Sequence, residues 1–314
     1  PRWWGGGPVA HPPPPSPQAG PHRCSITDPD VFWLDAARGI DWTRQPTTAV
    51  DSSRPPFYRW FPDGELNGWY KSTDRHIEAG RGDQAAYIYD SAVTGVKETI
   101  TYSQLLDQGE AFAGALRAEG VGRGDRVVIY MPMIPRAAVA MLACARLGAI
   151  HSVVFGGFAA PELAIRIDDA RPKVIVTATG GIEPTRRIPY FPMVAKALRL
   201  SYASPSAVIV ASRAEHFPDE VFPETPGVTW TDWDDAVAVA EPAGPVAVAA
   251  NDPLYVLYTS GTTGMPKGVV RDNGGHPGAP PGAMGEVYGV APGDGGGAAP
   301  RRRRGGGGPD NRFA

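Results

Sequence analysis

Short apolar runs alternate with longer helical patterns through the middle of the chain. DRVVIYMP at 125–132 is almost continuously apolar, whereas SQLLDQGEAFAGALRAEG at 103–120 places its apolar residues at helical spacing and ends at Gly120. Continuously apolar strands are typical of a parallel sheet that is covered on both faces. The alternation therefore predicts an α/β fold of mostly parallel sheets flanked by helices.

The same reading predicts the order of the elements. Two strands joined by a turn are expected at 85–91 and 97–104, and Thr27 or Asp28 is a candidate N-cap for an earlier helix. The remaining strands are expected at 125–132, 151–158, 173–178, 207–212 and 253–260, and the helices at 103–120, 134–150, 160–171 and 191–200. In parallel sheets, ligands bind outside the carboxyl ends of the strands. Three loops with unusual chemistry leave such ends: FGGF, TATGGIEPTRR and TSGTTGMPKG.

Glycine and proline are concentrated at the two ends of the chain, in PRWWGGGPVAHPPPPSPQAGPHR at 1–23 and APGDGGGAAPRRRRGGGGPDNRFA at 291–314. Such compositions cannot pack a core, so we expect both ends to be disordered. The basic run Arg301–Arg304 lacks interleaved aromatic residues, and we interpret it as part of a flexible tail rather than as an RNA-binding segment. The first residue is proline rather than methionine, which favours a fragment or an imperfect gene model.

Charge and cysteine content exclude several classes of protein. Thirty basic and 33 acidic residues give a net charge of −3, so no global field selects nucleic acid or an anionic membrane. No apolar run of about 18 residues predicts a membrane span. Cys24 and Cys144 lie far apart, and Cys144 sits in an apolar helical pattern, so no disulfide framework is expected. We predict a reducing compartment, the cytoplasm, with the mitochondrial matrix as the alternative.

The loop YTSGTTGMPKG at 258–268 carries the clearest candidate chemistry. Its glycines let the backbone turn its N–H groups inward, its hydroxyl groups add donors, and its lysine adds a compact positive charge. Together these groups suit the phosphates of a nucleoside triphosphate, although the spacing differs from that of the Walker A loop. The alternative is an ordinary surface turn. The predicted phosphate-binding residues are Thr259, Ser260, Gly261, Thr262, Thr263, Gly264 and Lys267.

This loop resembles the phosphate-loop signature of the adenylate-forming acyl-CoA synthetases. VVIYMPMIPRAAVAMLACARLGAIHSVVFGGFAAPELAIRIDDARPKVIVTA resembles the short-chain branch of that family, the acetyl- and propionyl-CoA synthetases. RWFPDGELNGWYKSTDRHIEAGRGDQAAYIYDS resembles their N-terminal cap region, and GIEP and KGVVRDNGGH favour the propionyl type. The resemblance covers residues 27–276.

The resemblance implies an acid–thiol ligase that uses ATP, Mg²⁺ and coenzyme A. In that family a carboxylate attacks the α-phosphate of ATP, and the thiol of coenzyme A then displaces AMP from the acyl-adenylate. By resemblance, the loop FGGF and an arginine of the segment TGGIEPTRR contact coenzyme A; for the arginines a solvated surface pair is the alternative. The candidate coenzyme A residues are Phe155, Gly156, Gly157, Arg186 and Arg187. The implied partners are small molecules, and the oligomeric state is not predicted.

The chain also departs from the family pattern. Phe191 stands near a position where the family usually carries a lysine, and the proline- and glycine-rich stretch after His276 replaces a helix. The family's adenine-binding loop, acyl pocket and C-terminal lysine do not appear. We therefore expect a disordered tail at 1–26, a cap region at 27–85, an incomplete AMP-binding domain at 86–276 and a low-complexity tail at 277–314. We expect no complete reaction from this chain alone, and predict no catalytic residue or metal ligand in it. The alternatives are a non-catalytic nucleotide- or coenzyme-A-binding remnant and another adenylate-forming ligase.

Three remaining polar features favour structural roles. His151 begins an apolar strand pattern and is expected in the core or at a strand end. Asp168 and Asp169 precede Arg171 and Pro172, which is typical of a solvated helix end. His216 and His276 have no histidine or cysteine neighbour at metal-ligand spacing.

Overall fold

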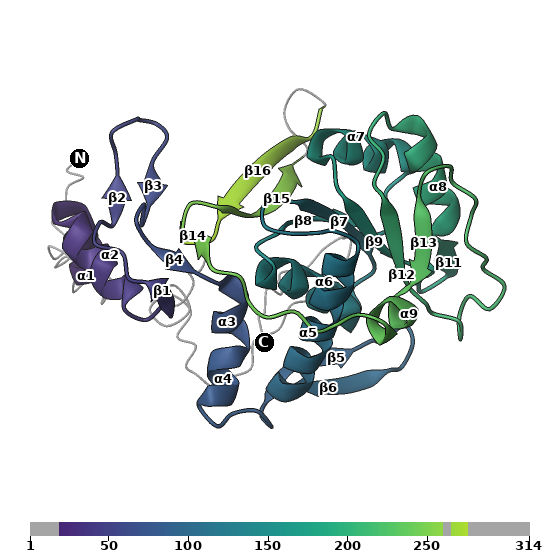
Figure 1. The fold of residues 1–314 in the computed structure, drawn as a ribbon, viewed down its shortest axis with the longest axis horizontal. Helices are drawn as coiled ribbons and strands as arrows, with labels where there is room; N and C mark the ends of the chain where they lie inside the picture. The colour runs from purple at the N-terminus through teal and green to yellow at the C-terminus, as the bar shows by residue number, and fades with distance from the viewer. Residues whose placement is uncertain (1–18, 260–264, 276–314) are drawn as a thin grey trace, which may run out of the picture.

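A seven-stranded sheet runs through the part of the chain that the computed structural model describes, residues 19–259 and 265–275 of 314 (Figure 1). From one edge to the other its strands are β13 (Thr229–Asp232), β12 (Ala207–Ala211), β9 (Val174–Ala178), β7 (Arg126–Met131), β8 (Ile150–Phe155), β15 (Pro253–Thr259) and β16 (Lys267–Asp272). Neighbouring strands are parallel except β15 and β16, which form an antiparallel pair. The expected class, a mostly parallel sheet flanked by helices, is confirmed.

Helices cover both faces of this sheet. On one face α5 (Tyr102–Ala118), α6 (Pro135–Arg146) and α9 (Trp233–Ala238) pack against side chains such as Val127 and Ile129. On the other, α7 (Ala160–Ala170) and α8 (Phe191–Leu200) pack against Val128 and Tyr130. Because successive side chains of a strand point to opposite faces, both sets of positions must be apolar. This explains why the central strands appear in the sequence as continuous apolar runs.

Local chemistry sets the helix ends, and one end differs from the prediction. The α5 helix begins with a capping box in which the Thr101 hydroxyl accepts from the Gln104 N–H and the Gln104 side chain accepts from the Thr101 N–H. The α6 helix was expected over 134–150 but ends at Arg146. Gly148 has a φ of +67°, and a Cβ there would lie 2.6 Å from Val248 Cγ1. The chain therefore leaves the helix at a position that only glycine fills without strain.

The N-terminal region carries short elements around a small aromatic core. Its elements are α1 (Ala19–Thr27), α2 (Pro29–Ala37), β1 (Trp42–Arg44), β2 (Val50–Asp51), β3 (Arg59–Trp60), β4 (Glu65–Leu66), α3 (Gly68–Ser72) and α4 (Asp74–Glu78). β1, β4 and β14 (Val248–Ala249) form one small sheet, and β2 pairs with β3. The Asp28 carboxylate caps α2, as one of the two expected N-caps. The core of the N-terminal region contains Phe61 and Leu66, with Trp33, Trp42 and Trp60 packed against them.

The predicted disordered tail at 1–26 is corrected at its C-terminal end, because α1 already begins at Ala19. Pro21 lies in the first turn of α1. Backbone N–H groups in a first turn have no acceptor within the helix, so the proline costs no hydrogen bond there. A side chain also hydrogen-bonds the backbone of α1, because the Thr27 hydroxyl donates to the Arg23 carbonyl at 3.0 Å. Residues 1–18 and 276–314, which hold the remaining tail predictions, lie outside the described residues.

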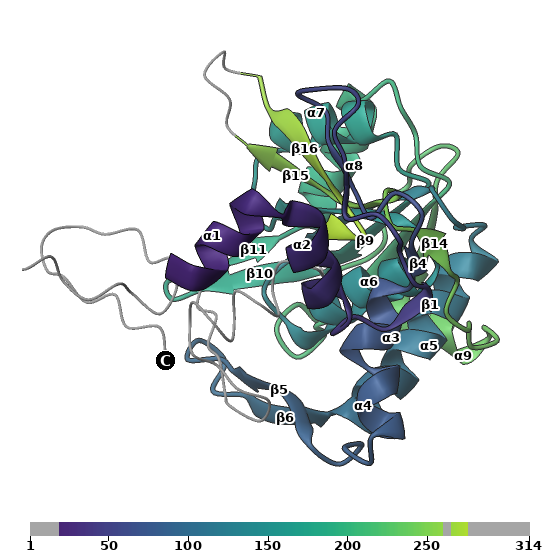
Figure 2. The same cartoon turned by 90° about the vertical axis from the view of Figure 1, so that its left-hand side faces the viewer.

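Two hairpins complete the described fold. β5 (Ala85–Asp90) pairs with β6 (Lys97–Thr101), as expected, and β10 (Gly180–Glu183) pairs with β11 (Arg186–Pro189), which was not predicted. In Figures 1 and 2 the β5–β6 hairpin lies below the main sheet, next to the beginning of α5. Tyr87 of β5 packs on the same core as α5 and α6. Within the described residues, no helix combines the length and apolarity needed to cross a membrane.

Trp69 of α3 joins the N-terminal region to the sheet domain. Its ring is fully buried and packs directly against Gly109 of α5, where a Cβ would overlap the ring. Just before it, the Asn67 side chain accepts from the Trp69 and Tyr70 N–H groups and donates to the Val246 carbonyl at 2.7 Å. The short helix α3 is therefore fixed at its start by a residue that also bonds a distant loop.

Arg146, the last residue of α6, forms the polar centre of this junction. Its side chain is 2% exposed. It donates to the Ala243 carbonyl at 2.5 Å, to both carboxylate oxygens of Asp74 at 3.1 and 3.2 Å, and to Glu110. Its guanidinium also lies 5.5 Å from the centroid of the Trp69 ring. A buried cation is held here by two carboxylates, a carbonyl and an aromatic face.

Lys71 of α3 provides a pH-dependent test of this junction. Burial, aided by the nearby Arg75, lowers the pKa of Lys71 from 10.5 to about 8. Between these two values the unfolded chain binds more protons than the folded chain, so stability rises with pH; below about pH 8 the full cost of burying the charge is present. We expect urea unfolding to show a steeper rise in stability between about pH 8 and about pH 10 for the wild-type chain than for Lys71→Met. The exposed Lys97→Met variant is the control, and equal slopes for the Lys71→Met and wild-type chains would contradict the expectation.

Candidate functional site

The three loops singled out in the sequence leave the same edge of the sheet. β8 ends at Phe155, β9 ends at Ala178 and β15 ends at Thr259. All three strands are parallel within one sheet, with Tyr255 of β15 opposite His151 of β8. Their carboxyl ends therefore face one side, which is where ligands bind in open α/β sheets. The structure places the described parts of all three predicted loops at this edge.

The phosphate-loop candidates lie at the end of the β15–β16 hairpin. Thr259 is the last residue of β15 and pairs across the hairpin with Lys267, the first residue of β16. The Lys267 side chain is exposed. Ser260, Gly261, Thr262, Thr263 and Gly264 lie outside the described residues, so their predicted role stays a prediction. The hairpin fixes the two flanking residues side by side.

The loop after β8 combines an exposed aromatic ring with two glycines that cannot be replaced freely. Phe155 is 64% exposed, with its ring centroid 5.7 Å from that of Phe158. A Cβ at Gly156 would overlap the Tyr190 hydroxyl and lie 2.7 Å from the Met131 carbonyl oxygen. Gly157 has a φ of +100°, a conformation that side chains other than hydrogen rarely allow. The backbone is thus tightly packed below an outward-facing ring.

The β10–β11 hairpin carries the two candidate arginines beside this loop. A Cβ at Gly181 would also overlap the Tyr190 hydroxyl, so this hydroxyl lies between the hairpin and the loop after β8. Arg186 donates to the Glu183 carboxylate at 2.8 Å, and Arg187 donates to the His216 carbonyl at 2.8 Å. Both side chains are exposed. Each guanidinium keeps donors beyond the one bonded nitrogen, so either could also meet an anion.

Two buried tyrosines that were not predicted from the sequence lie against the loop after β8, and Tyr130 is hydrogen-bonded to it. The Tyr130 hydroxyl donates to the Phe158 carbonyl at 2.8 Å and accepts from the Gly157 N–H at 3.1 Å. Burial raises the pKa of Tyr130 to about 12. Burial also raises the pKa of Tyr190, and the nearby Tyr130 raises it further by a smaller amount. Both hydroxyls therefore remain protonated donors at neutral pH. The available signal was a tyrosine at the carboxyl end of an apolar strand, in VVIYMP.

The end of α7 differs from the expected solvated helix end, because both of its aspartates accept hydrogen bonds. Asp168 is half-buried, and its carboxylate accepts from the Tyr202 and Ala203 N–H groups at 2.9 and 3.1 Å. Asp169 is exposed, as expected, but accepts from the Tyr258 hydroxyl at 2.5 Å. The first carboxylate stabilises the turn after α8, because it satisfies two backbone donors there. The second anchors the end of β15.

Other residues of interest have structural positions. His151 is buried beside Tyr255, as expected for a core residue. Phe191, at the position where the resembled family usually has a lysine, is 2% exposed and packs on Phe222 and Trp230, so it faces the core rather than the site. Cys144 is buried, and burial raises the pKa of its thiol. Among residues 19–259 and 265–275, no group of three or more His, Cys, Asp or Glu side chains could hold a metal ion.

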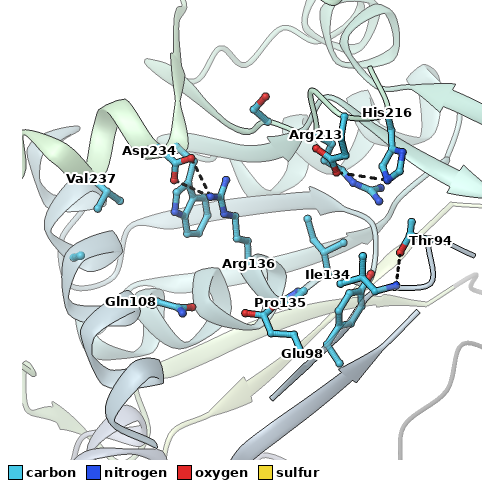
Figure 3. A pocket seen from close by; sticks show the side chains of 16 residues that line it. Thr94, Glu98, Gln108, Ile134, Pro135, Arg136, Arg213, His216, Asp234 and Val237 are labelled. Atoms are coloured by element: carbon cyan, nitrogen blue, oxygen red, sulfur yellow. Dashed lines mark hydrogen bonds and ion pairs between the residues drawn. The ribbon is translucent and has the colours of Figure 1, made fainter. Parts of the chain in front are cut away.

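A pocket of about 480 Å³ lies between α5, α6, α9 and the β5–β6 hairpin (Figure 3). Arg136 and Asp234 form an ion pair at 2.7 Å on one wall, and Arg213 and His216 lie on another. Arg187 bonds the backbone of His216 from the other side. None of the described residues predicted as binding residues lines this pocket, so it is separate from the candidate site.

Comparisons with known proteins identify relatives over most of the chain. The family model of AMP-binding enzymes matches residues 74–276, and that of the acetyl-coenzyme A synthetase N-terminus matches residues 21–72. An uncharacterized protein of Pseudomonas aeruginosa is 53% identical over 273 residues, covering 87% of this chain and 43% of that protein. A Bos taurus protein named acyl-CoA synthetase short-chain family member 3, mitochondrial, is 48% identical over 270 residues, covering 86% and 39%.

A solved structure of a synthetase has a similar fold. Acetoacetyl-CoA synthetase from Streptomyces lividans matches with a TM-score of 0.77 and 28% identity, covering 90% of this chain and 42% of that one. The chain spans about two fifths of the length of the curated relatives it matches.

Proposed function

Because the chain belongs to the family of AMP-binding enzymes, we propose that it carries the first part of an ATP-dependent acid–thiol ligase. The reaction joins a short-chain carboxylate, propionate or acetate, to coenzyme A through an acyl-adenylate, with release of pyrophosphate and AMP. The observation that carries the proposal is the convergence of the predicted phosphate side and coenzyme A side on one edge of the parallel sheet. The match of residues 21–72 to an acetyl-coenzyme A synthetase N-terminus supports a short-chain ligase over other adenylate-forming enzymes.

On the phosphate side, Thr259, Lys267 and the segment between them would hold the β- and γ-phosphates of ATP. Lysine is suited to this role, because its ammonium is a compact charge that meets phosphate oxygens from several directions. Fixed positive charge at this point stabilises the negative charge that develops as pyrophosphate leaves. The magnesium ion would neutralise the same phosphates when bound; the described residues contain no group of three or more His, Cys, Asp or Glu side chains that could hold a metal ion, and we assign it no protein ligand.

On the coenzyme A side, the geometry fits a nucleotide with an aromatic base and phosphates. The exposed Phe155 ring offers a face on which adenine can stack. The glycines below it let a ligand approach the backbone closely. Arg186 and Arg187 stand on the adjoining hairpin with donors to spare for phosphate oxygens. These assignments, like the division of the chain at residue 85, are proposals.

The first test is direct binding of Mg·ATP to the 314-residue chain. We expect Lys267→Ala to raise the dissociation constant by about tenfold, a loss of about 1.4 kcal/mol, because one charged contact to phosphate is removed. Isothermal titration calorimetry measures this. Lys97→Ala, an exposed lysine on the β5–β6 hairpin, is the matched control and should bind as the wild type does. Equal affinities of the wild-type and Lys267→Ala chains would contradict the phosphate-loop assignment.

A non-catalytic nucleotide- or coenzyme-A-binding remnant is the second candidate. It is favoured by one observation: the groups that the structure places at the strand ends, the exposed Phe155 ring, the Arg186 and Arg187 side chains and Lys267, are suited to binding ligands. ATP–pyrophosphate exchange driven by propionate or acetate separates the two. Exchange that is lost in Lys267→Ala supports adenylate formation by this chain, whereas binding without exchange supports a binding role for it. For compartment we propose the cytoplasm, with the mitochondrial matrix as the alternative.

A further inference from the structure

One side chain of α7 contacts aromatic residues from both sides of the candidate site. The guanidinium carbon of Arg166 lies 5.0 Å from the centroid of the Phe158 ring and 5.6 Å from that of the Tyr258 ring. Phe158 belongs to the loop after β8, and Tyr258 is the second-last residue of β15. The side chain of Arg166 is buried. A planar cation so placed attracts the electron-rich faces of both rings.

Further contacts hold this cation and its two aromatic neighbours in place. Arg166 Nη1 donates to the Glu162 carbonyl at 2.6 Å and to its carboxylate at 2.9 Å, one helical turn earlier. The Tyr258 hydroxyl donates to Asp169, also on α7, so the helix holds this residue at its ring and at its tip. A hydrogen bond to a carboxylate increases the electron density of the phenol ring, which strengthens its attraction for the guanidinium.

The contacts continue from Phe158 into the sheet. Its carbonyl accepts from the Tyr130 hydroxyl, which also receives the Gly157 N–H. The path from the end of β15 to the loop after β8 is therefore unbroken. It runs through Asp169, Tyr258, Arg166, Phe158 and Tyr130, all of them described residues.

We propose that Arg166 is a positioning residue that couples the loop at 155–158 to the end of β15. Through it the coenzyme A side and the phosphate side of the site take up their positions together. The identity of the two ligands rests on the proposed function, whereas the coupling itself does not. The hydrogen bond to Asp169 holds only Tyr258, whereas Arg166 contacts the rings of both Tyr258 and Phe158. Lysine would keep the charge but lose the planar face that stacks on them.

Backbone amide hydrogen exchange of the unliganded 314-residue chain tests the coupling. In Arg166→Met we expect exchange in segments 155–159 and 255–259 to rise together by about fivefold or more, with β9 unchanged as an internal reference. Arg166→Lys should give a smaller rise in both. Arg136→Met is the matched control: the Arg136 guanidinium lies 5.5 Å from the centroid of the Trp233 ring and pairs with Asp234 on the opposite face of the sheet, and its loss should leave both segments as in the wild type.

A second variant keeps the test decisive if Arg166→Met does not fold. Phe158→Leu removes one ring from the loop after β8, and coupling predicts faster exchange across the site, at 255–259. A rise confined to the mutated loop would overturn the proposal. So would equal exchange patterns in Arg166→Met and Arg136→Met.

Ligand binding separates failure of the coupling from failure of the proposed function. If the wild-type chain binds coenzyme A and Mg·ATP, Arg166→Met should weaken both by about tenfold, and an effect below about twofold on both would overturn the proposal. If the wild-type chain binds neither, the proposed function fails for this chain. The exchange measurement then still decides whether Arg166 couples the two segments.

Discussion

Replacing Arg146 by methionine is expected to lower the free energy of unfolding by about 3 kcal/mol, near the lower end of the range for breaking a buried ion pair. The side chain is 2% exposed and bonds Asp74, Glu110 and the Ala243 carbonyl. Methionine fills similar space but leaves two carboxylates and a carbonyl without their donor. The loss of stability is limited because Asp74 and Glu110 retain some access to water. Urea unfolding followed by tryptophan fluorescence measures the change.

An exposed arginine supplies the control for this measurement. Arg38 pairs with Asp35 at 3.3 Å, and both side chains are mostly exposed. Arg38→Met should change the free energy of unfolding by less than about 0.5 kcal/mol, because surface ion pairs contribute little. A loss in Arg146→Met as small as that in Arg38→Met would mean that the buried network does not stabilise the junction.

Gly109→Ala is expected to destabilise the chain by about 2–3 kcal/mol, the cost of overpacking a core. The sign of this change in stability tests the contact with Trp69. In an ordinary helix interior the same change stabilises by about 0.5–1 kcal/mol, because alanine has the higher helix propensity. Here a Cβ would overlap the outer ring atoms of the fully buried Trp69. Thermal unfolding and urea titration give the change.

A double substitution shows whether the overlap with Trp69 is the cause. Phenylalanine at position 69 lacks the outer ring atoms that a new Cβ would meet, so Trp69→Phe combined with Gly109→Ala should lose less stability than the sum of the two single losses. Gln108→Ala, at an exposed neighbouring position of α5, should stay within about 0.5 kcal/mol of the wild type. Additive losses in the double variant would refute the steric explanation.

The elements predicted well are those whose signal is local. The central strands β7, β9 and β12 are buried on both faces, so their apolar runs stand out in the sequence. β16 was not predicted: KGVVRD has mixed polarity, its side chains are almost all exposed, and it becomes a strand by pairing with β15. The β10–β11 hairpin, rich in glycine and arginine, was missed for a similar reason. Pairing between segments decides these elements, and composition does not reveal it.

For the candidate site, too, only the features with a local signal in the sequence were predicted. Loop composition predicted a phosphate site at 259–267, because glycine, hydroxyl and basic residues after a strand point to phosphate chemistry, whereas the roles of the segments at 155–158 and 186–187 were predicted from the family resemblance. The groups that support these loops and those that hold the N-terminal junction were not predicted. Arg146 meets Asp74 across 72 residues of sequence, and Asp169 meets Tyr258 across 89. A charged residue within an apolar helical pattern, as Arg146 and Arg166 both are, is the one sign in the sequence that a buried partner exists.

The two matched family models meet between residues 72 and 74, within the junction between the N-terminal region and the sheet domain. Asn67 and Trp69 lie on one side of that division and Asp74 on the other, yet all three are held by α5 and α6 through Gly109, Arg146 and the backbone around it. The boundary between the two family models therefore falls inside one packed junction. We expect the N-terminal region and the sheet to unfold together, because the contacts of Asn67, Trp69 and Asp74 cross between them.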